Sequence, residues 1–316
     1  MIVSIKKLLK TSIPLIFGAV LVWYSLSKIS INVLIGYFKE ANYEWIFLGL
    51  FFGILSHLSR AYRWKFMLDP LGFKPRFTNS VLAVLVGYLV NLAIPRAGEV
   101  SRAFVLTNYE QIPFEKGFGT IVAERIADLV MMLCIIIITL FVQFDFIYDL
   151  LTKNFDASKI SISLIILTII CYILYFFVKK ATSGILLKIK TFVIGLVEGV
   201  TSIFRMKNKV AFIFHTIFIW VMYVAMFWAT IPAISGLEVP FGGVLIGFIA
   251  GGFSIAATNG GIGLYPIAVA GALALFDIPS DPATAFGWIM WTAQTAMIII
   301  FGGLAFLFLP IYNKHK

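Results

Sequence analysis

The sequence predicts an all-α integral membrane protein, because its composition is too apolar for a protein whose surface faces water. Apolar residues make up 61% of the 316-residue chain, charged residues only 13%, and the mean hydropathy is +0.99. A soluble globular domain carries about 25% charged residues. The composition therefore excludes a water-soluble protein, a disordered chain and a secreted disulfide scaffold.

Six apolar segments predict transmembrane helices, since a bilayer core requires roughly 20 apolar residues per helix. These segments run approximately over residues 13–26, 45–58, 121–144, 160–178, 210–231 and 285–309. Basic residues precede the first segment, as in a signal peptide, but no small-residue cleavage site follows it. We therefore expect an uncleaved first helix.

Two further apolar regions, 77–108 and 241–276, are each interrupted in the middle. The first is broken at Asn91–Glu99 and the second at Ala257–Pro266. Each region predicts a re-entrant hairpin, which enters the membrane, breaks and returns on the same side. Irregular backbone at membrane depth is tolerated only where protein or a water-filled cavity surrounds it.

The distribution of Lys and Arg predicts the orientation of these segments. With a cytoplasmic N-terminus and two re-entrant regions, most basic residues face the cytoplasm, and only four lysines face outward: Lys28, Lys39, Lys153 and Lys159. The net charge of +10 then reflects topology and not nucleic-acid binding. Both termini are predicted to be cytoplasmic.

The same topology divides the single membrane domain, 1–316, into halves 1–150 and 151–316. Each half contains three crossings and one hairpin, so the second half is inverted relative to the first. Broken segments in corresponding positions of inverted halves are typical of transporters and mark the substrate site.

The segment 183–205 predicts an amphipathic helix on the cytoplasmic membrane surface. Its apolar residues recur at helical spacing, whereas Lys188 and Glu198 fall elsewhere. A short extension linking two spans is the alternative.

Three acidic and three basic residues lie in or beside apolar surroundings near the first break: Arg96, Glu99, Arg102, Glu124, Arg125 and Asp128. An unpaired charge at the bilayer centre costs about 2.5–3.5 kcal/mol, so they must be paired, hydrated or near the interface. One interpretation is a salt-bridge lattice that locks the hairpin against the following helix. The other is a polar site, including Asn91, where the arginines meet an anionic head group and the acids tune it.

Glycines are concentrated around the second break. Gly243, Gly247 and Gly251 form small-xxx-small steps, which predict close helix packing. Another group predicts a tight turn whose backbone N–H groups and following helix N-terminus attract an anion, or a plain hairpin turn. Its members are Asn259, Gly260, Gly261 and Gly263.

Arg60, Arg63 and Lys65 lie at the inner edge of the second predicted span, with Tyr62 and Trp64 between them. They predict an interfacial anchor, and a basic cluster beside aromatic residues also suits recruitment of anionic lipid. The sequence has no His-Glu-x-x-His metal motif, nucleophile elbow or Walker-type loop, so it predicts no catalytic residues, metal or cofactor.

These motifs together resemble the lysylphosphatidylglycerol synthase transmembrane family, also called flippase-like domain proteins. The resemblance is carried by Arg60-Ala-Tyr-Arg-Trp64, Asn91-x-x-x-Pro-Arg-Ala-Gly-Glu-Val-x-Arg-Ala103, Glu124-Arg-x-x-Asp128 and Asn259-Gly-Gly-Ile-Gly263. It covers almost the whole chain. It implies a multi-pass protein of a bacterial or archaeal cytoplasmic membrane, similar to proteins associated with moving lysylated phosphatidylglycerol between leaflets.

Two departures from the family's pattern shape the expectation. The chain ends directly after its last predicted span, where the best-known members carry a soluble aminoacyl-transferase domain, so we expect no lysyl-lipid synthesis. In many members the glycine block lies between proline and glutamate, whereas here Asn259 precedes it and Tyr265-Pro266 follows it. The resemblance therefore implies neither an acidic site residue in the second half of the chain nor the identity of the lipid.

The sequence thus predicts a translocase for an anionic phospholipid or polyprenyl-phosphate lipid, with membrane lipids as its partners. An alternative is a lipid-binding accessory module that transports nothing and positions a lipid-modifying or glycolipid-synthesising enzyme. A third is a lipid-modifying enzyme, for which Glu99 and Glu124 are the candidate acid–base pair.

Overall fold

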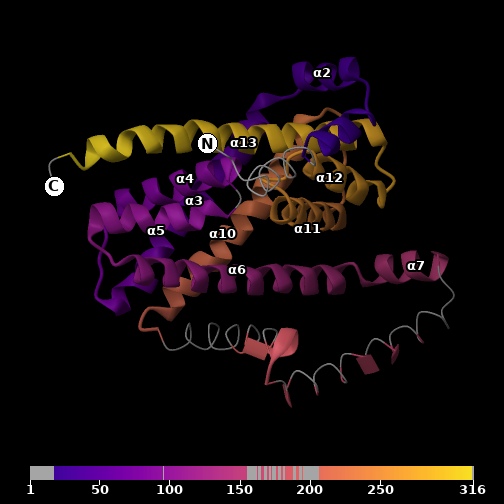
Figure 1. The fold of residues 1–316 in the computed structure, drawn as a ribbon. Coiled ribbons are helices and arrows are strands. Elements are labelled where there is room, and N and C mark those ends of the chain that lie inside the picture. The colour runs from indigo at the N-terminus through magenta and orange to yellow at the C-terminus, as the bar shows by residue number, and fades with distance from the viewer. Residues whose placement is uncertain are drawn as a thin grey trace, which may run out of the picture. The chain divides into compact units, whose positions relative to one another are not determined.

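The computed structural model describes residues 18–94, 96–154 and 206–314, together with scattered positions between 162 and 194. Within these residues every regular element is a helix (Figure 1). The predicted span 160–178 and the predicted amphipathic helix 183–205 lie outside the continuously described residues, as does the start of the first predicted span.

The chain folds as two compact units, which we describe separately. The first comprises Met1–Glu124 with Val210–Lys316, and the second comprises Arg125–Lys209. The second contains most of α6 (Phe114–Val142), which begins in the first unit, and α7 (Phe144–Asn154). The prediction of two inverted halves stays a prediction.

The first unit contains the remaining helices that the structure describes. They are Gly18–Leu26, α2 (Ile31–Glu40), α3 (Tyr43–Leu68), η1 (Asp69–Leu71), α4 (Phe77–Ala93), α5 (Ala97–Glu110), α10 (Lys209–Thr230), η2 (Ile231–Ala233), α11 (Phe241–Ala257), α12 (Leu264–Ala274) and α13 (Ser280–Tyr312). The sequence did not predict α2 as a separate helix, and it lies at 84° to Gly18–Leu26.

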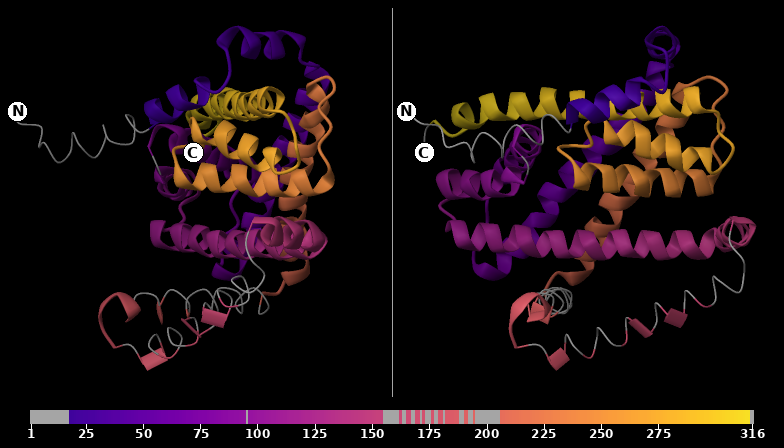
Figure 2. Two further views of the ribbon diagram at one scale, coloured as in Figure 1. Left: turned by 90° about the vertical axis from the view of Figure 1, so that its right-hand side faces the viewer. Right: turned by 45° about the vertical axis from the view of Figure 1, so that its right-hand side comes forward.

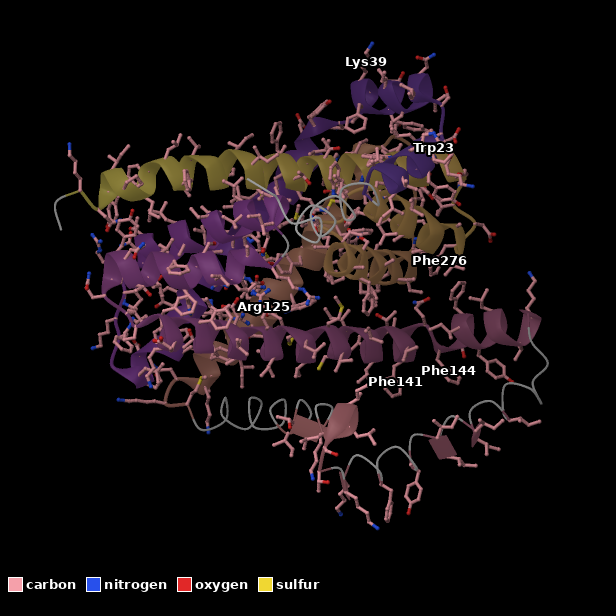
Figure 3. The ribbon with its side chains drawn as sticks, in the orientation of Figure 1. Trp23, Lys39, Arg125, Phe141, Phe144 and Phe276 are labelled. Atoms are coloured by element: carbon pink, nitrogen blue, oxygen red, sulfur yellow. The ribbon has the colours of Figure 1, made fainter. Side chains whose placement is uncertain are left out.

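Four described helices are long and apolar enough to cross a membrane: α3, α6, α10 and α13. The bent pair formed by Gly18–Leu26 and α2 makes a fifth if it counts as one span. Large apolar side chains cover the outer surfaces, for example Trp23 and Phe141, which are 70% and 79% exposed (Figure 3). Such surfaces suit a hydrocarbon environment, and the count of six spans stays a prediction.

The first broken region forms an antiparallel hairpin of α4 and α5. The turn falls within the predicted break, and Arg96 adopts a left-handed conformation there, with φ of 60°. The Asn91 side chain accepts a hydrogen bond from the Gly98 N–H at 2.7 Å, which satisfies one backbone donor at the start of α5. Gly87 and Gly98 allow the two helices to approach closely, because a Cβ at Gly98 would collide with the Gly87 carbonyl oxygen.

The second broken region also forms an antiparallel hairpin, made of α11 and α12. Its turn contains Gly260, Gly261 and Gly263, all with φ between 63° and 81°, a range that glycine adopts without strain. The packing role predicted for the glycines of α11 is confirmed. A Cβ at Gly247 would lie 2.9 Å from the Phe227 ring, and one at Gly251 would lie 2.7 Å from the Tyr265 ring.

The long helix α13 packs against both hairpins, which approach it from its two ends (Figure 2). Gly302, in its second half, contacts α4, whereas Gly287, in its first half, contacts Pro266 of α12. The two turns meet between these contacts: a Cβ at Gly260 would lie 2.8 Å from Leu92 Cδ2, and Trp291 Nε1 donates to the Gly260 carbonyl at 2.8 Å.

The base of the first hairpin is fastened to the end of α13 by a polar clasp of Arg76, Asn79, Glu110 and Asn313. Arg76 Nε donates to Glu110 Oε1 at 2.9 Å. The Asn79 and Asn313 side-chain amides exchange two hydrogen bonds of 3.0 Å. Arg76 also bonds Asn313, and Asn79 bonds Glu110. The clasp therefore holds the start of α4 and the end of α5 in place against the end of α13.

We predict that adjacent glycines of α13 respond in opposite ways to alanine. A Cβ at Gly302 would lie 2.8 Å from Leu89 Cβ and 2.9 Å from the Leu85 carbonyl oxygen, whereas one at Gly303 meets nothing within 4 Å. Gly302→Ala should destabilise the protein by about 1–3 kcal/mol through overpacking. Gly303→Ala should be neutral or gain up to about 1 kcal/mol of helix propensity. Thermal unfolding in detergent measures both, and equal unfolding temperatures would contradict the close packing of α13 on α4.

Candidate functional site

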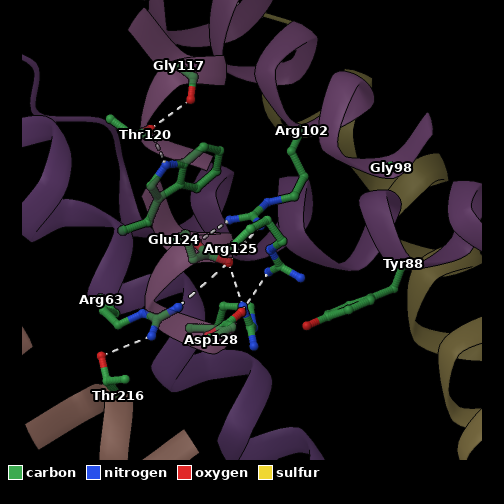
Figure 4. A network of polar contacts seen from close by, with 12 residues as sticks. Arg63, Tyr88, Gly98, Arg102, Gly117, Thr120, Glu124, Arg125, Asp128 and Thr216 are labelled. Atoms are coloured by element: carbon green, nitrogen blue, oxygen red, sulfur yellow. Dashed lines mark hydrogen bonds and ion pairs between the residues drawn. The ribbon is translucent and has the colours of Figure 1, made fainter. Parts of the chain in front are cut away.

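The candidate site is a cluster of three arginines around one fully buried carboxylate, Glu124 (Figure 4). Arg102 donates from Nη1 to Oε1 at 3.0 Å and from Nη2 to Oε2 at 3.1 Å. Arg60 Nη1 donates to Oε1 at 2.5 Å, and Arg63 Nη2 lies 3.8 Å from the same oxygen. We name these four residues the Glu124 cluster.

Three helices supply the Glu124 cluster. Arg60 and Arg63 lie on α3, Arg102 on α5 and Glu124 on α6. All four side chains are at most 6% exposed. Ionic hydrogen bonds between buried groups are strong, because little water competes for the charges.

Neighbouring side chains hold the guanidinium groups in place. The Arg102 guanidinium lies over the Trp64 ring, with its Cζ 4.4 Å from the centroid. The Trp64 indole donates to Thr120 Oγ1 at 2.8 Å, and Thr120 donates to the Gly117 carbonyl at 2.7 Å. A cation–π contact and a fixed ring thus orient the planar group of Arg102.

Arg63 is positioned by α10. Its Nη1 donates to Thr216 Oγ1 at 2.9 Å, and Thr216 donates to the Phe212 carbonyl at 2.7 Å. The Arg63 guanidinium also lies over the Phe212 ring at 5.3 Å. The Glu124 cluster is therefore connected to a fourth helix.

Polar aromatic residues border the Glu124 cluster on the side of Arg60. Arg60 Nη2 lies 3.4 Å from the Tyr223 hydroxyl, which lies 3.3 Å from that of Tyr88. The Tyr88 ring packs 4.5 Å from the buried imidazole of His57. Within the described part of the chain, both His57 ring nitrogens and Arg102 Nε are buried and have no hydrogen-bond partner. Buried polar atoms of this kind are uncommon in proteins and call for an explanation.

The structure brings together only some of the residues that the sequence placed in the site. Arg102 and Glu124 pair directly, as either interpretation of the charged residues requires. Arg96 is exposed at the hairpin turn, and Glu99 is half-buried on α5 with Oε2 lacking a hydrogen-bond partner among the described residues. Asn91 has the structural role at the turn described above.

Arg125 and Asp128 belong to the second unit and pair with each other, with Arg125 Nη2 3.2 Å from Asp128 Oδ2. They lie three residues apart on α6, a spacing that puts two side chains on one helix face.

The glycine-rich turn is closely packed. Besides the contacts of Gly260, a Cβ at Gly263 would lie 2.5 Å from the Val22 nitrogen, in the helix Gly18–Leu26. Asn259 is half-buried at the same turn. The turn thus lies against the first described helix, α4 and α13.

The interfacial anchor predicted from Arg60, Arg63 and Lys65 requires correction. Arg60 and Arg63 are buried in the Glu124 cluster, and only Lys65 is exposed, with Nζ 5.9 Å from the centre of the Tyr62 ring. The spacing carried a usable signal, because Arg60, Arg63 and Trp64 fall three and four residues apart and so share one helix face. The contributions of His57, Tyr88, Thr120, Thr216 and Tyr223 were not predicted.

The comparison with known proteins shows the family. The chain matches the lysylphosphatidylglycerol synthase TM region over residues 12–302 and therefore belongs to this family. It is a multi-pass membrane protein, as the family and the apolar helices together indicate.

Two relatives are similar to parts of the sequence. A UPF0104 membrane protein, MJ1595 of Methanocaldococcus jannaschii, is 32% identical over 125 residues, which is 39% of this chain and 37% of that protein. The glycosyltransferase AglD of Haloferax volcanii is 31% identical over 77 residues, 24% of this chain and 12% of AglD. The chain thus matches well under two thirds of either relative's length. No solved structure matches.

We predict that Glu124→Gln strongly destabilises the protein. The substitution removes the negative charge on which three buried guanidinium groups converge, and breaking a buried ion pair costs about 3–5 kcal/mol. The control is Glu44→Gln, at an exposed carboxylate in the first turn of α3, which should cost no more than about 1 kcal/mol. The measurement is thermal unfolding in detergent, and similar losses in both variants would contradict a structural role for the cluster.

Proposed function

We propose that the protein translocates a lipid with an anionic, phosphate-containing head group between the leaflets of the membrane. The observation that carries the proposal is the Glu124 cluster: three guanidinium groups around one buried carboxylate, on helices that include one arm of a broken hairpin. A guanidinium binds phosphate in the same bidentate geometry in which Arg102 binds Glu124.

The position of the hairpin turns supports the proposal. α13 has 33 residues and is therefore about 50 Å long, whereas a bilayer core is about 30 Å thick. The two turns meet beside Trp291, about 8 Å from the midpoint of α13. If α13 spans the membrane, both hairpins are re-entrant and their turns lie within the hydrocarbon core. Arg102 is then only about 9 Å along α5 from Arg96 at the turn.

Glu124 has a defined part in the proposed mechanism. The lipid phosphate displaces the carboxylate from Arg102, so that one anion replaces another and the guanidinium is never left without a counter-charge. When the lipid leaves, Glu124 binds Arg102 again. A carboxylate that competes with the substrate in this way prevents the arginines from holding the phosphate permanently.

The unsatisfied atoms beside the cluster also suit this function. The Nη atoms of Arg102 both bond Glu124, whereas its Nε–H group has no acceptor among the described residues. The His57 ring offers a donor and an acceptor in the same region. Polar groups of this kind reduce the desolvation cost of a head group inside the membrane.

The distribution of charge in the first unit supports an orientation with a cytoplasmic C-terminus. Lys65, Lys74 and Arg76 lie at the end of the unit where α3 ends and α4 begins, beside the end of α13. The acidic residues Glu238, Asp277 and Asp281 lie on the loops and helix start at the other end. By the positive-inside rule the basic end faces the cytoplasm. The cytoplasmic membrane of a bacterium or archaeon is the proposed location.

The test is leaflet exchange in vesicles reconstituted with the purified protein. Vesicles of phosphatidylglycerol carry a trace of head-group-labelled phosphatidylglycerol, and a membrane-impermeant quencher destroys the label in the outer leaflet. Wild-type protein should expose the inner-leaflet label as well. Arg102→Ala should slow this exchange about 10- to 100-fold, since a charge-assisted hydrogen bond contributes about 1.5–3 kcal/mol.

Two controls make the exchange assay decisive. Lys65→Ala removes an exposed cation of α3 without touching the Glu124 cluster and should exchange lipid at the wild-type rate. Arg96→Ala tests whether the exposed arginine at the turn also contacts the head group. Arg102→Ala protein that is folded and exchanges lipid as fast as wild type would exclude the proposed site.

A second function is favoured by one comparison. One relative whose sequence is similar to part of this chain is named a glycosyltransferase. An accessory module that binds a lipid and presents it to a lipid-modifying partner enzyme would fit that likeness. In this case gentle release from detergent into a mass spectrometer would show a retained anionic lipid, lost in Arg102→Ala, while wild-type vesicles would show no leaflet exchange.

A further inference from the structure

A surface groove of the first unit runs between α3, the start of α4 and α10. It has a volume of about 280 Å³, and its lining includes Leu58, Ser59, Tyr62, Phe77, Phe214 and His215. Almost all of its lining is carbon. Several lining side chains are well exposed, including Phe214 at 60% and Phe77 at 48%.

A polar pair interrupts this apolar lining. Ser59 Oγ and His215 Nδ1 are 2.8 Å apart, joining α3 to α10. Ser59 is buried, whereas the His215 ring is half-buried and packs against the rings of Tyr62 at 5.0 Å and Phe214 at 5.4 Å. Polar side chains on the lipid-facing side of a spanning helix are costly and usually functional.

The groove and the Glu124 cluster involve the same two helices, α3 and α10. Ser59 directly precedes Arg60 and lies one helical turn before Arg63, and His215 directly precedes Thr216, to which Arg63 donates. An apolar surface with a polar pair therefore lies beside a cationic site. This order matches an amphiphile with a hydrocarbon chain, polar linking atoms and an anionic head group.

We propose that the groove binds a segment of one hydrocarbon chain of a glycerophospholipid, with an ester or ether oxygen of the glycerol linkage at Ser59 and His215. The proposal rests on the proposed function, because the head group of the same lipid reaches the Glu124 cluster. A volume of about 280 Å³ lies at the lower limit of ligand pockets, so the groove holds only part of a chain.

The polar pair determines which lipid fits. Bilayer lipid is as apolar as the groove, so the hydrophobic effect does not favour entry of a chain, and selectivity must come from packing and hydrogen bonds. A glycerophospholipid carries oxygen acceptors between its chain and its phosphate. A polyprenyl phosphate has no polar atom before its phosphate, so it leaves the hydroxyl and imidazole without a bonding partner from the lipid.

The experiment is photolabelling of the full-length protein in phosphatidylglycerol vesicles. One probe is phosphatidylglycerol with a diazirine on one acyl chain, and the other is a polyprenyl phosphate with a diazirine on its chain. Peptide mass spectrometry locates the label. We expect the phosphatidylglycerol probe to label groove residues of α3 and α10 above the level found at Leu48, a lipid-facing residue of α3 outside the groove.

Three variants test the groove itself. Leu58→Trp fills the groove and should reduce labelling of α10 to the level at Leu48. Leu48→Trp adds the same ring to the same helix outside the groove and should leave labelling unchanged. His215→Phe keeps a ring but removes both nitrogens, and it should abolish the preference for phosphatidylglycerol over the polyprenyl probe, with Ser59→Ala as a smaller change of the same kind.

The outcomes separate this proposal from the proposed function. Groove labelling at the Leu48 level, labelling unchanged by Leu58→Trp, or preference for the polyprenyl probe would each overturn the proposal. If Arg102→Ala nevertheless stops leaflet exchange in these cases, the proposed function stands without the groove. Selective groove labelling without any leaflet exchange would support the lipid site and overturn translocation.

Discussion

The first unit depends on one electrostatic constraint, the burial of the Glu124 carboxylate among three guanidinium groups. A carboxylate offers about four lone-pair positions, and here a single side chain accepts bonds from residues of two other helices. Because a guanidinium group in an apolar interior requires a nearby counter-charge, the relative positions of α3, α5 and the start of α6 are fixed at this point. The Trp64–Thr120 and Arg63–Thr216 contacts limit the cluster's geometry further. The same groups that hold these helices together form the phosphate site that we propose.

The two hairpins depend on protein contacts at their breaks and on close packing against α13. A helix that breaks within an apolar region leaves backbone donors and acceptors that lipid cannot satisfy. Here protein side chains supply partners: Asn91 accepts from the Gly98 N–H, and the Trp291 indole donates to the Gly260 carbonyl. Glycines of α13 then let each hairpin approach the long helix closely. Contacts with protein groups therefore stabilise both breaks, as two short helices that turn back within an apolar region require.

The sequence predicted the breaks more accurately than the cluster, for identifiable reasons. Gly98 and the run Asn259–Gly263 are local signals, and such residues favour turns whatever surrounds them. The pairing of Arg102 with Glu124 could be anticipated from the sequence, because charges in an apolar chain must find partners. For Arg60 and Arg63 the spacing with Trp64 indicated a shared helix face, but the sequence does not show whether that face meets protein or the membrane surface. The bend of 84° before α2 was not predicted, because polar residues such as Ser27, Lys28 and Ser30 indicate that a helix ends but not the angle at which the next one starts.

The clasp at the base of the first hairpin has a mechanical consequence. Arg76, Asn79, Glu110 and Asn313 join one end of the α4–α5 pair to α13 by hydrogen bonds, whereas near the turn at the other end Leu92 lies against Gly260 of the second hairpin. Arg102 restrains the middle of α5 through Glu124, so the hairpin is held at two levels, its base and the Glu124 cluster. The exposed turn at Arg96 is the part of the hairpin that lies beyond both restraints.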